Sequence, residues 1–315
     1  MISESLTKKL SSPTLYFPIS GDRYSTRAGL ARFGTDFGHG QPDAQLFQFD
    51  KTFSHYRNNK LAVREQAIDD YVCTNAIDAR SLAEATKFIL HHLCNEHPDK
   101  FSLHRSSQKM TLDCHLTNEQ LIIDNDYSLS TPHKPEYKNL FDALALQISE
   151  DICLMQVTDT GTKLIAAHLC AANHWSARDK LLMDMPHLHQ HVPGFADDNK
   201  EPEKLLQGIS HKTEAYVRFA WGLCDQAVLN QHPHVSLKSK SSDDLFMRIE
   251  RQVIWPIPDS QILLFTIRTY FRDCTTLDEQ QRLALIKAIN SMSEATLKYK
   301  NINKADVLNK LNSKL

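Results

Sequence analysis

The chain has 315 residues, 41% of them hydrophobic and 23% charged, with a formal net charge of −2. This composition is typical of a globular protein with a substantial core, and the near-neutral charge excludes a global basic field for nucleic acid or an anionic membrane. The seven cysteines are scattered without a CxxC pair, which excludes a disulfide framework and a cysteine-ligated cluster. With no apolar signal core or membrane-span pattern, we expect a reduced, cytoplasmic protein.

The first third of the chain is expected to be irregular and then helical. Residues 1–45 contain prolines and a glycine cluster, and no periodic pattern. From Asp50 to His97 the apolar spacing predicts helix. Ser81 and Glu84 fit a capping box, and Pro98 would end the segment.

A run of strands is predicted in the middle of the chain, interrupted by one short helix. Alternating or continuous apolar patterns bounded by turn residues indicate these strands. The expected strands are Lys109–Leu116, Glu119–Asn125, Ile152–Val157, Lys163–Cys170 and Ala215–Leu223, and the helix is Leu140–Asp151.

The segment from Leu245 to Arg272 predicts a long hairpin, with two apolar strands joined at a turn that contains Pro256 and Pro258. Alternation places Arg248 and Glu250 on one side of the first strand, and Thr266, Arg268 and Tyr270 on one side of the second. If these sides meet, they form a polar strip. Such a strip is either a structural ion-pair network or a clamp for carboxylates or phosphates.

A terminal helix is expected from Thr276, capped with Glu279. The order of helices, strands and helices predicts an α+β fold, with an antiparallel sheet flanked by N- and C-terminal helices. We divide this single unit into 1–100, an irregular segment and helices; 101–275, the sheet domain; and 276–315, the C-terminal helices.

Two histidine patterns stand out among the sixteen histidines. His187, His189 and His191 lie between Pro186 and Pro193. An extended backbone there would point all three the same way, as a facial metal site requires, although histidines in loops are often only solvated.

His168 lies in an apolar strand beside small alanines. It is either a hydrogen-bonded core residue or a neighbour of a flat macrocycle.

Four sequence blocks resemble one known family. RIERQ (Arg248 to Gln252) and LFTIRTY (Leu264 to Tyr270) are similar to the C-terminal signature of a family first catalogued as domain of unknown function 3445. LIAAHLCAANHW (Leu164 to Trp175) and HLHQHVPGF (His187 to Phe195) resemble a second block of it. The characterised branch is the alpha subunit of heme-dependent oxidative N-demethylase.

The resemblance implies a PAS-like fold that binds heme b, as a heme-dependent monooxygenase subunit. It implies oxidative N-demethylation of a small secondary amine, dimethylamine-like, with O2 and release of formaldehyde. Electrons would come from NADPH through partner subunits that carry flavin and an iron–sulfur centre. The sequence shows no dinucleotide fingerprint and no cluster spacing, which agrees with an external reductase.

The family motifs also suggest roles for individual residues. His189 falls on the family histidine, and His191, where the family has proline, is the alternative iron ligand. The remaining assignments are Arg248 and Arg268 for the propionates, His168 and Trp175 beside the cofactor, and Trp221 and Tyr270 in the active site.

Departures from the family pattern at His191, Ala220 and Gly222 keep other functions open. One is a non-enzymatic PAS-like sensor of heme or another small ligand. A second is a divergent scaffold subunit that has lost heme. A third is a non-heme metal protein built on His187, His189 and His191.

Overall fold

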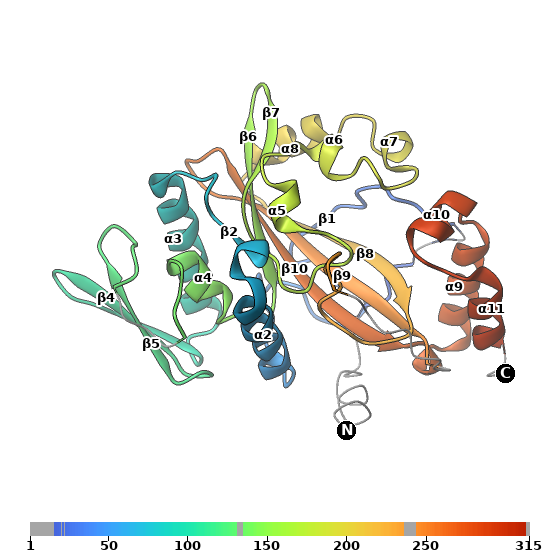
Figure 1. Ribbon diagram of the computed structural model, residues 1–315, viewed down its shortest axis with the longest axis horizontal. Coiled ribbons are helices and arrows are strands. Elements are labelled where there is room, and N and C mark those ends of the chain that lie inside the picture. Colours follow the sequence, from blue (N-terminus) through green and yellow to red (C-terminus); the bar gives the residue numbers. More distant parts are fainter. Residues whose placement is uncertain (1–15, 20, 22, 131–134, 236–243, 313–315) are drawn as a thin grey trace.

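A seven-stranded antiparallel sheet with helices on both faces forms the centre of the computed structural model (Figure 1). The structure describes residues 16–19, 21, 23–130, 135–235 and 244–312. The predicted α+β class is confirmed, while its PAS-like character and the three-part division of the chain stay predictions. Most of residues 1–45, which were predicted to be irregular, are described. Residues 1–15, 20 and 22 lie outside the described ranges. No helix in the described ranges is long and apolar enough to cross a membrane.

The large sheet has the order β1-β8-β9-β10-β6-β7-β2, and all neighbours are antiparallel. The predicted strands in the middle of the chain are present within a residue or two of their expected ends. The bounds are β1 Ala31–Arg32, β2 Val72–Cys73, β6 Asp151–Thr158, β7 Gly161–His168, β8 Tyr216–Cys224, β9 Phe246–Pro256 and β10 Ile262–Asp273.

The predicted hairpin is β9 and β10, the central pair of the sheet. Asp259 in its turn adopts a left-handed φ of 55°, which Asp tolerates better than most residues. Arg268 pairs with Arg251, and Thr269 pairs with Glu250. Directly opposed residues share a face, so Arg268 lies on the face opposite Glu250. The predicted polar strip that joined them is therefore wrong.

The Arg251 face of the hairpin carries buried ion pairs. Arg251 is fully buried and donates to both carboxylate oxygens of Asp43, Nε to Oδ2 at 2.8 Å and Nη2 to Oδ1 at 2.5 Å. Arg268 is equally buried and donates from Nη2 to Asp50 Oδ2 at 2.9 Å. These contacts connect the irregular N-terminal segment to the centre of the sheet.

Helices α2 (Phe53–Tyr71) and α3 (Ala79–Glu96) form the predicted helical segment. The α3 helix begins two residues before Ser81, because the side chain of Asp78 caps it by accepting from Ser81 N. The predicted capping box of Ser81 and Glu84 is therefore wrong. Helix α4 (Leu140–Ala145) ends six residues before the predicted end at Asp151, where β6 begins.

A separate three-stranded sheet lies beside α3 and α4 (Figure 1). It contains β3 (Phe101–Arg105), β4 (Lys109–Cys114) and β5 (Glu119–Asp124). The β4–β5 hairpin was predicted and β3 was not.

Four short helices cover the face of the large sheet opposite to the Arg251 face. They are α5 (Ala177–Lys180), α6 (Met185–Leu188), α7 (Phe195–Asp198) and α8 (Pro202–Ser210). The segment Pro186–Pro193 begins inside α6 and is not extended, so the predicted alignment of three histidines is wrong. His187 is largely exposed and contacts Asp184.

The C-terminal segment forms three helices instead of one. They are α9 (Glu279–Asn290), α10 (Glu294–Tyr299) and α11 (Lys304–Asn312), and they lie at the end of the molecule away from β3–β5 (Figure 1). The capping box of α9 is made by Asp278 and Gln281, so the predicted start at Thr276 with Glu279 is wrong.

Replacing Arg251 with Leu should lower the free energy of unfolding by about 3 kcal/mol, because Asp43 would remain buried without its cation. Urea denaturation measures this change. The control is Lys204→Met, since Lys204 and Glu201 are 72% and 61% exposed and such pairs contribute about 1 kcal/mol at most. Equal losses in the two variants would contradict a stabilising role for the Arg251 pair.

Candidate functional site

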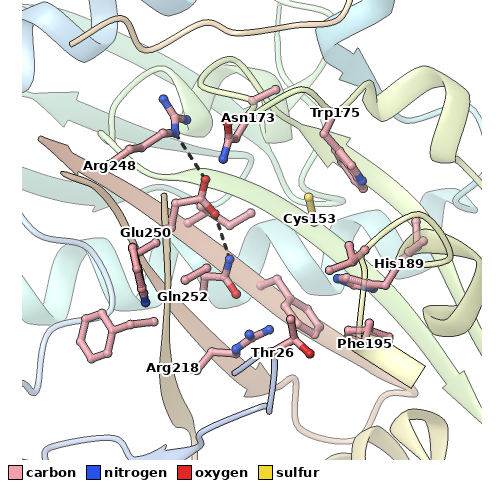
Figure 2. A pocket seen from close by; sticks show the side chains of 18 of the residues that line it. Thr26, Cys153, Asn173, Trp175, His189, Phe195, Arg218, Arg248, Glu250 and Gln252 are labelled. Atoms are coloured by element: carbon pink, nitrogen blue, oxygen red, sulfur yellow. Dashed lines mark hydrogen bonds and ion pairs between the residues drawn. The ribbon is translucent and has the colours of Figure 1, made fainter. Parts of the chain in front are cut away.

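A cavity of about 290 Å³ lies between the large sheet and the α6–α7 segment (Figure 2). Its floor is the face of β9 that carries Arg248, Glu250 and Gln252, together with residues of β6, β8 and β10. Residues 24–27 and the end of α10 complete the wall. The volume is at the lower end of the range for small-molecule and cofactor sites.

His189 extends into the cavity from the end of α6 as a neutral imidazole. Its Nδ1 lies 3.1 Å from the carbonyl oxygen of Met185. A carbonyl only accepts, so Nδ1 carries the proton and Nε2 has a free lone pair. Burial lowers the pKa of His189 to about 4, against the opposing effect of the Met185 hydrogen bond. The ring stacks on Phe195, with centroids 4.4 Å apart, which fixes its orientation.

Arg218 on β8 is a half-buried cation with one unpaired donor in the described parts of the chain. Its Nε is buried and makes no hydrogen bond, and Arg218 and Thr26 both line the cavity (Figure 2). Desolvation by burial lowers the pKa of the Arg218 guanidinium, and Glu250 partly offsets this effect. A buried unpaired cation is costly, so this position favours an anionic ligand.

Glu250 is the carboxylate on the cavity floor, and its side chain is 15% exposed. Its Oε2 accepts from Gln252 Nε2 at 3.0 Å, and its Oε1 lies 3.5 Å from Arg248 Nε. The Arg248 Nη atoms donate to the backbone oxygens of Val228, Leu229 and Ala171. Arg248 is therefore held rigidly, with Nε as its remaining donor.

An amine and two aromatic rings form another corner of the cavity. Lys300 donates from Nζ to the backbone oxygen of Trp221 at 2.7 Å. Its Nζ lies 5.2 Å from the ring centroid of Tyr24 and 6.0 Å from that of Trp221. These are distances at which ring faces stabilise a cation.

The structure brings half of the predicted site residues together. His189, Trp175, Trp221 and Arg248 all line the cavity. His191 is exposed and is not part of the described lining.

His168 lies outside this lining, fully buried on the side of α4. Its Nε2 is 3.1 Å from Asp142 Oδ1, and its Nδ1 is 3.6 Å from Cys170 Sγ. These contacts match the core-histidine interpretation.

Arg268 and Tyr270 are also absent from the lining. Both belong to the face of β10 that is directed away from the cavity: Arg268 lies over the ring of Tyr56, and Tyr270 donates to the side-chain oxygen of Gln48. Neither is placed to contact a ligand in the cavity.

Sequence reasoning missed Arg218 and Lys300. The alternation in Tyr216–Cys224 gave a usable signal for Arg218, because it shares a strand face with Ala220 and Gly222. Lys300 follows a short helix that was predicted as part of a longer one, so no sequence pattern indicated that it returns to the sheet.

A family model described as haem-dependent oxidative N-demethylase, alpha subunit-like, matches residues 39–307. The chain belongs to this family. The match confirms the resemblance inferred from the four sequence blocks, and the N-demethylase family name implies dependence on heme and an enzyme with more than one subunit. Of the described residues that line the cavity, all lie within the matched span except residues 24–27. A comparison with curated proteins finds no match.

The neutral state of His189 predicts a pH dependence for the cofactor-free protein. Because the folded-state pKa is about 4, below the usual 6.5, the unfolded chain binds more protons between these values. Stability should therefore fall as pH decreases from 6.5 to 4, and His189→Gln should reduce that slope. Urea denaturation across this range tests it, with His191→Gln as the control from the same segment. An unchanged slope in His189→Gln would contradict a buried neutral imidazole.

Proposed function

We propose that this chain is the heme b subunit of an oxidoreductase that demethylates a small secondary amine of the dimethylamine type. The reaction would consume O2, release formaldehyde and draw electrons from partner subunits. One observation carries the proposal: the unprotonated Nε2 of His189 shares a cavity with the buried, unpaired Nε of Arg218.

The donor set fits a heme. A neutral imidazole is a common axial ligand for heme iron, and ligating histidines usually donate their other N–H to a carbonyl or carboxylate. His189 has this arrangement through the Met185 carbonyl oxygen. His189 is therefore the proposed iron ligand in preference to His191, which is exposed.

The cation surplus fits the two carboxylates of heme b. Arg218 and Arg248 line the cavity, and the Nε of each is buried without a hydrogen-bond partner, while that of Arg248 also lies 3.5 Å from Glu250 Oε1. We assign propionate binding to these two arginines. Arg268 is not retained in this role, because its guanidinium faces the opposite side of the sheet and contacts Asp50.

Bound heme would supply the activation of O2, using electrons delivered from outside the chain. The chain's own residues would bind and orient the amine. Glu250 has carboxylate lone pairs beyond the hydrogen bond from Gln252, and these can accept N–H groups of a protonated secondary amine. The Trp175 and Trp221 side chains would limit access of water.

The first experiment compares heme retention in single histidine variants. Protein expressed with ample heme precursor is passed through gel filtration, and its Soret absorbance per chain is measured. His189→Ala should lose most of the band or shift it, because the proposed iron ligand would be gone, whereas His191→Ala should retain it. An unchanged spectrum in His189→Ala would exclude His189 as the ligand.

Arg218→Met should weaken hemin binding about tenfold to a hundredfold, which corresponds to losing about 1.4 to 3 kcal/mol of a charge-assisted contact. Arg178→Met is the control, because Arg178 is 66% exposed and lies outside the described lining. Hemin titration monitored at the Soret band gives both affinities. Equal affinities would remove Arg218 from the proposed site.

A heme or small-ligand sensor is the second candidate. It is favoured by Ala220, which lines the cavity where the family pattern implied a polar residue. Turnover separates the two functions: the heme-loaded protein is given dimethylamine, O2 and a reductase, and formaldehyde is measured. Heme retention without formaldehyde would support the sensor.

A further inference from the structure

Lys300 has an unusual environment for a lysine. It caps the end of α10, and its amine reaches the cavity between Tyr24 and Trp221. Within the described residues, Nζ has one hydrogen bond, to the Trp221 backbone oxygen, and no carboxylate at ion-pair distance. A surface lysine would instead be solvated on all sides. This amine lies in a largely apolar corner with two of its three hydrogens unassigned.

Burial in this corner shifts the Lys300 amine toward its neutral form, although the cation still predominates at pH 7. Burial lowers the pKa of Lys300 to about 8, and Glu250 on β9 opposes this shift. The other titratable groups around this corner are Arg218 on β8, Tyr24 and Tyr299. Burial raises the pKa of Tyr24 to about 12, so that phenol stays neutral. About a tenth of the Lys300 amine is therefore unprotonated at pH 7.

We propose that Lys300 is a carbonyl-capturing amine that forms a reversible imine with a small aldehyde in the cavity. Lysines desolvated in a protein cavity are a known type of activated nucleophile. If the proposed function holds, the aldehyde is the formaldehyde that the reaction releases. The capture chemistry itself needs neither heme nor turnover.

The chemistry balances without an oxidant. The Nζ lone pair attacks the carbonyl carbon, a C–N bond forms, and the carbonyl oxygen takes a proton to give a carbinolamine. Protonation of its hydroxyl then breaks the C–O bond and releases water, which leaves a protonated imine on Lys300. Hydrolysis reverses both steps and returns the aldehyde.

Space and solvation favour a one-carbon aldehyde. Gly222 lies next to the amine, and a Cβ there would be 3.9 Å from Nζ, so the glycine leaves that side free for an added carbon. The Tyr24 and Trp221 rings flank the amine and reduce the water that would hydrolyse an imine. Captured formaldehyde would thus remain in the cavity instead of reacting with other amines.

Reductive trapping tests the proposal. The full chain is incubated at pH 7 with substoichiometric ¹³C-formaldehyde and cyanoborohydride, and methylation is mapped by peptide mass spectrometry. Lys300 should be labelled at least about tenfold more than Lys87 and Lys204, whose side chains are 57% and 72% exposed, because its neutral fraction is higher. Labelling of Lys300 at or below the level of the two exposed lysines would overturn the proposal.

Lys300→Arg is the matched variant, because a guanidinium keeps the cation near Tyr24 and Trp221 but forms no imine. The wild-type Lys300 peptide should be labelled most steeply up to about pH 8, while exposed lysines should still gain at pH 10. The Lys300→Arg protein should bind less formaldehyde in total, while the labels on Lys87 and Lys204 do not fall and the unfolding midpoint is unchanged. Unchanged total occupancy would count against the proposal.

Hemin uptake, measured on the same samples, keeps this result separate from the proposed function. Labelling of Lys300 in a protein that takes up no hemin would support the reactive amine and contradict the heme enzyme. Hemin uptake with unlabelled Lys300 would contradict the reactive amine but not the proposed heme site.

Discussion

The register of β9 against β10 is the constraint on which the cavity depends. Successive side chains on these strands alternate between faces, so the pairing that turns Arg251 and Arg268 toward Asp43 and Asp50 also turns Glu250 toward the cavity. A slip of one residue would exchange the two faces. In β9 it would turn Arg251 toward the cavity and bury Glu250 on the side of Asp43, so that both charges would lose their partners. The buried ion pairs on one side thus specify the chemistry on the other.

The cavity itself carries features that reduce stability unless a ligand binds. Arg218 has a buried, unpaired Nε, and His189 has a free Nε2. Lys300 is held partly desolvated. Groups of this kind tend to cluster at functional sites, where binding supplies the missing partners. The proposed heme would supply these partners, its iron for His189 and its carboxylates for the arginines.

The sequence was informative where the pattern was local. The β9–β10 hairpin, the β6–β7 pair and the core face of α3 follow from alternation and helical spacing. Helix starts were misplaced because Asp78 and Asp278 cap α3 and α9, each a few residues from the predicted caps. The segment around His187 and His191 was predicted as extended, but Asp184 caps a short helix there.

The site was only partly predictable, for a physical reason. His189, Trp175, Trp221 and Arg248 were found through family motifs, and all line the cavity. Arg268 and Tyr270 were chosen from the same signature, and alternation alone does not say which face of a strand meets a ligand. Arg218 and Lys300 depend on contacts between segments far apart in the sequence, which no local pattern encodes.

The most direct test of this account is a hemin titration of the wild-type, cofactor-free protein, with the Soret band recorded at each addition. The account predicts saturation at one heme per chain, with the spectrum of iron bound by a neutral histidine. A protein that takes up no hemin, or that binds it without a defined stoichiometry, would contradict the heme site.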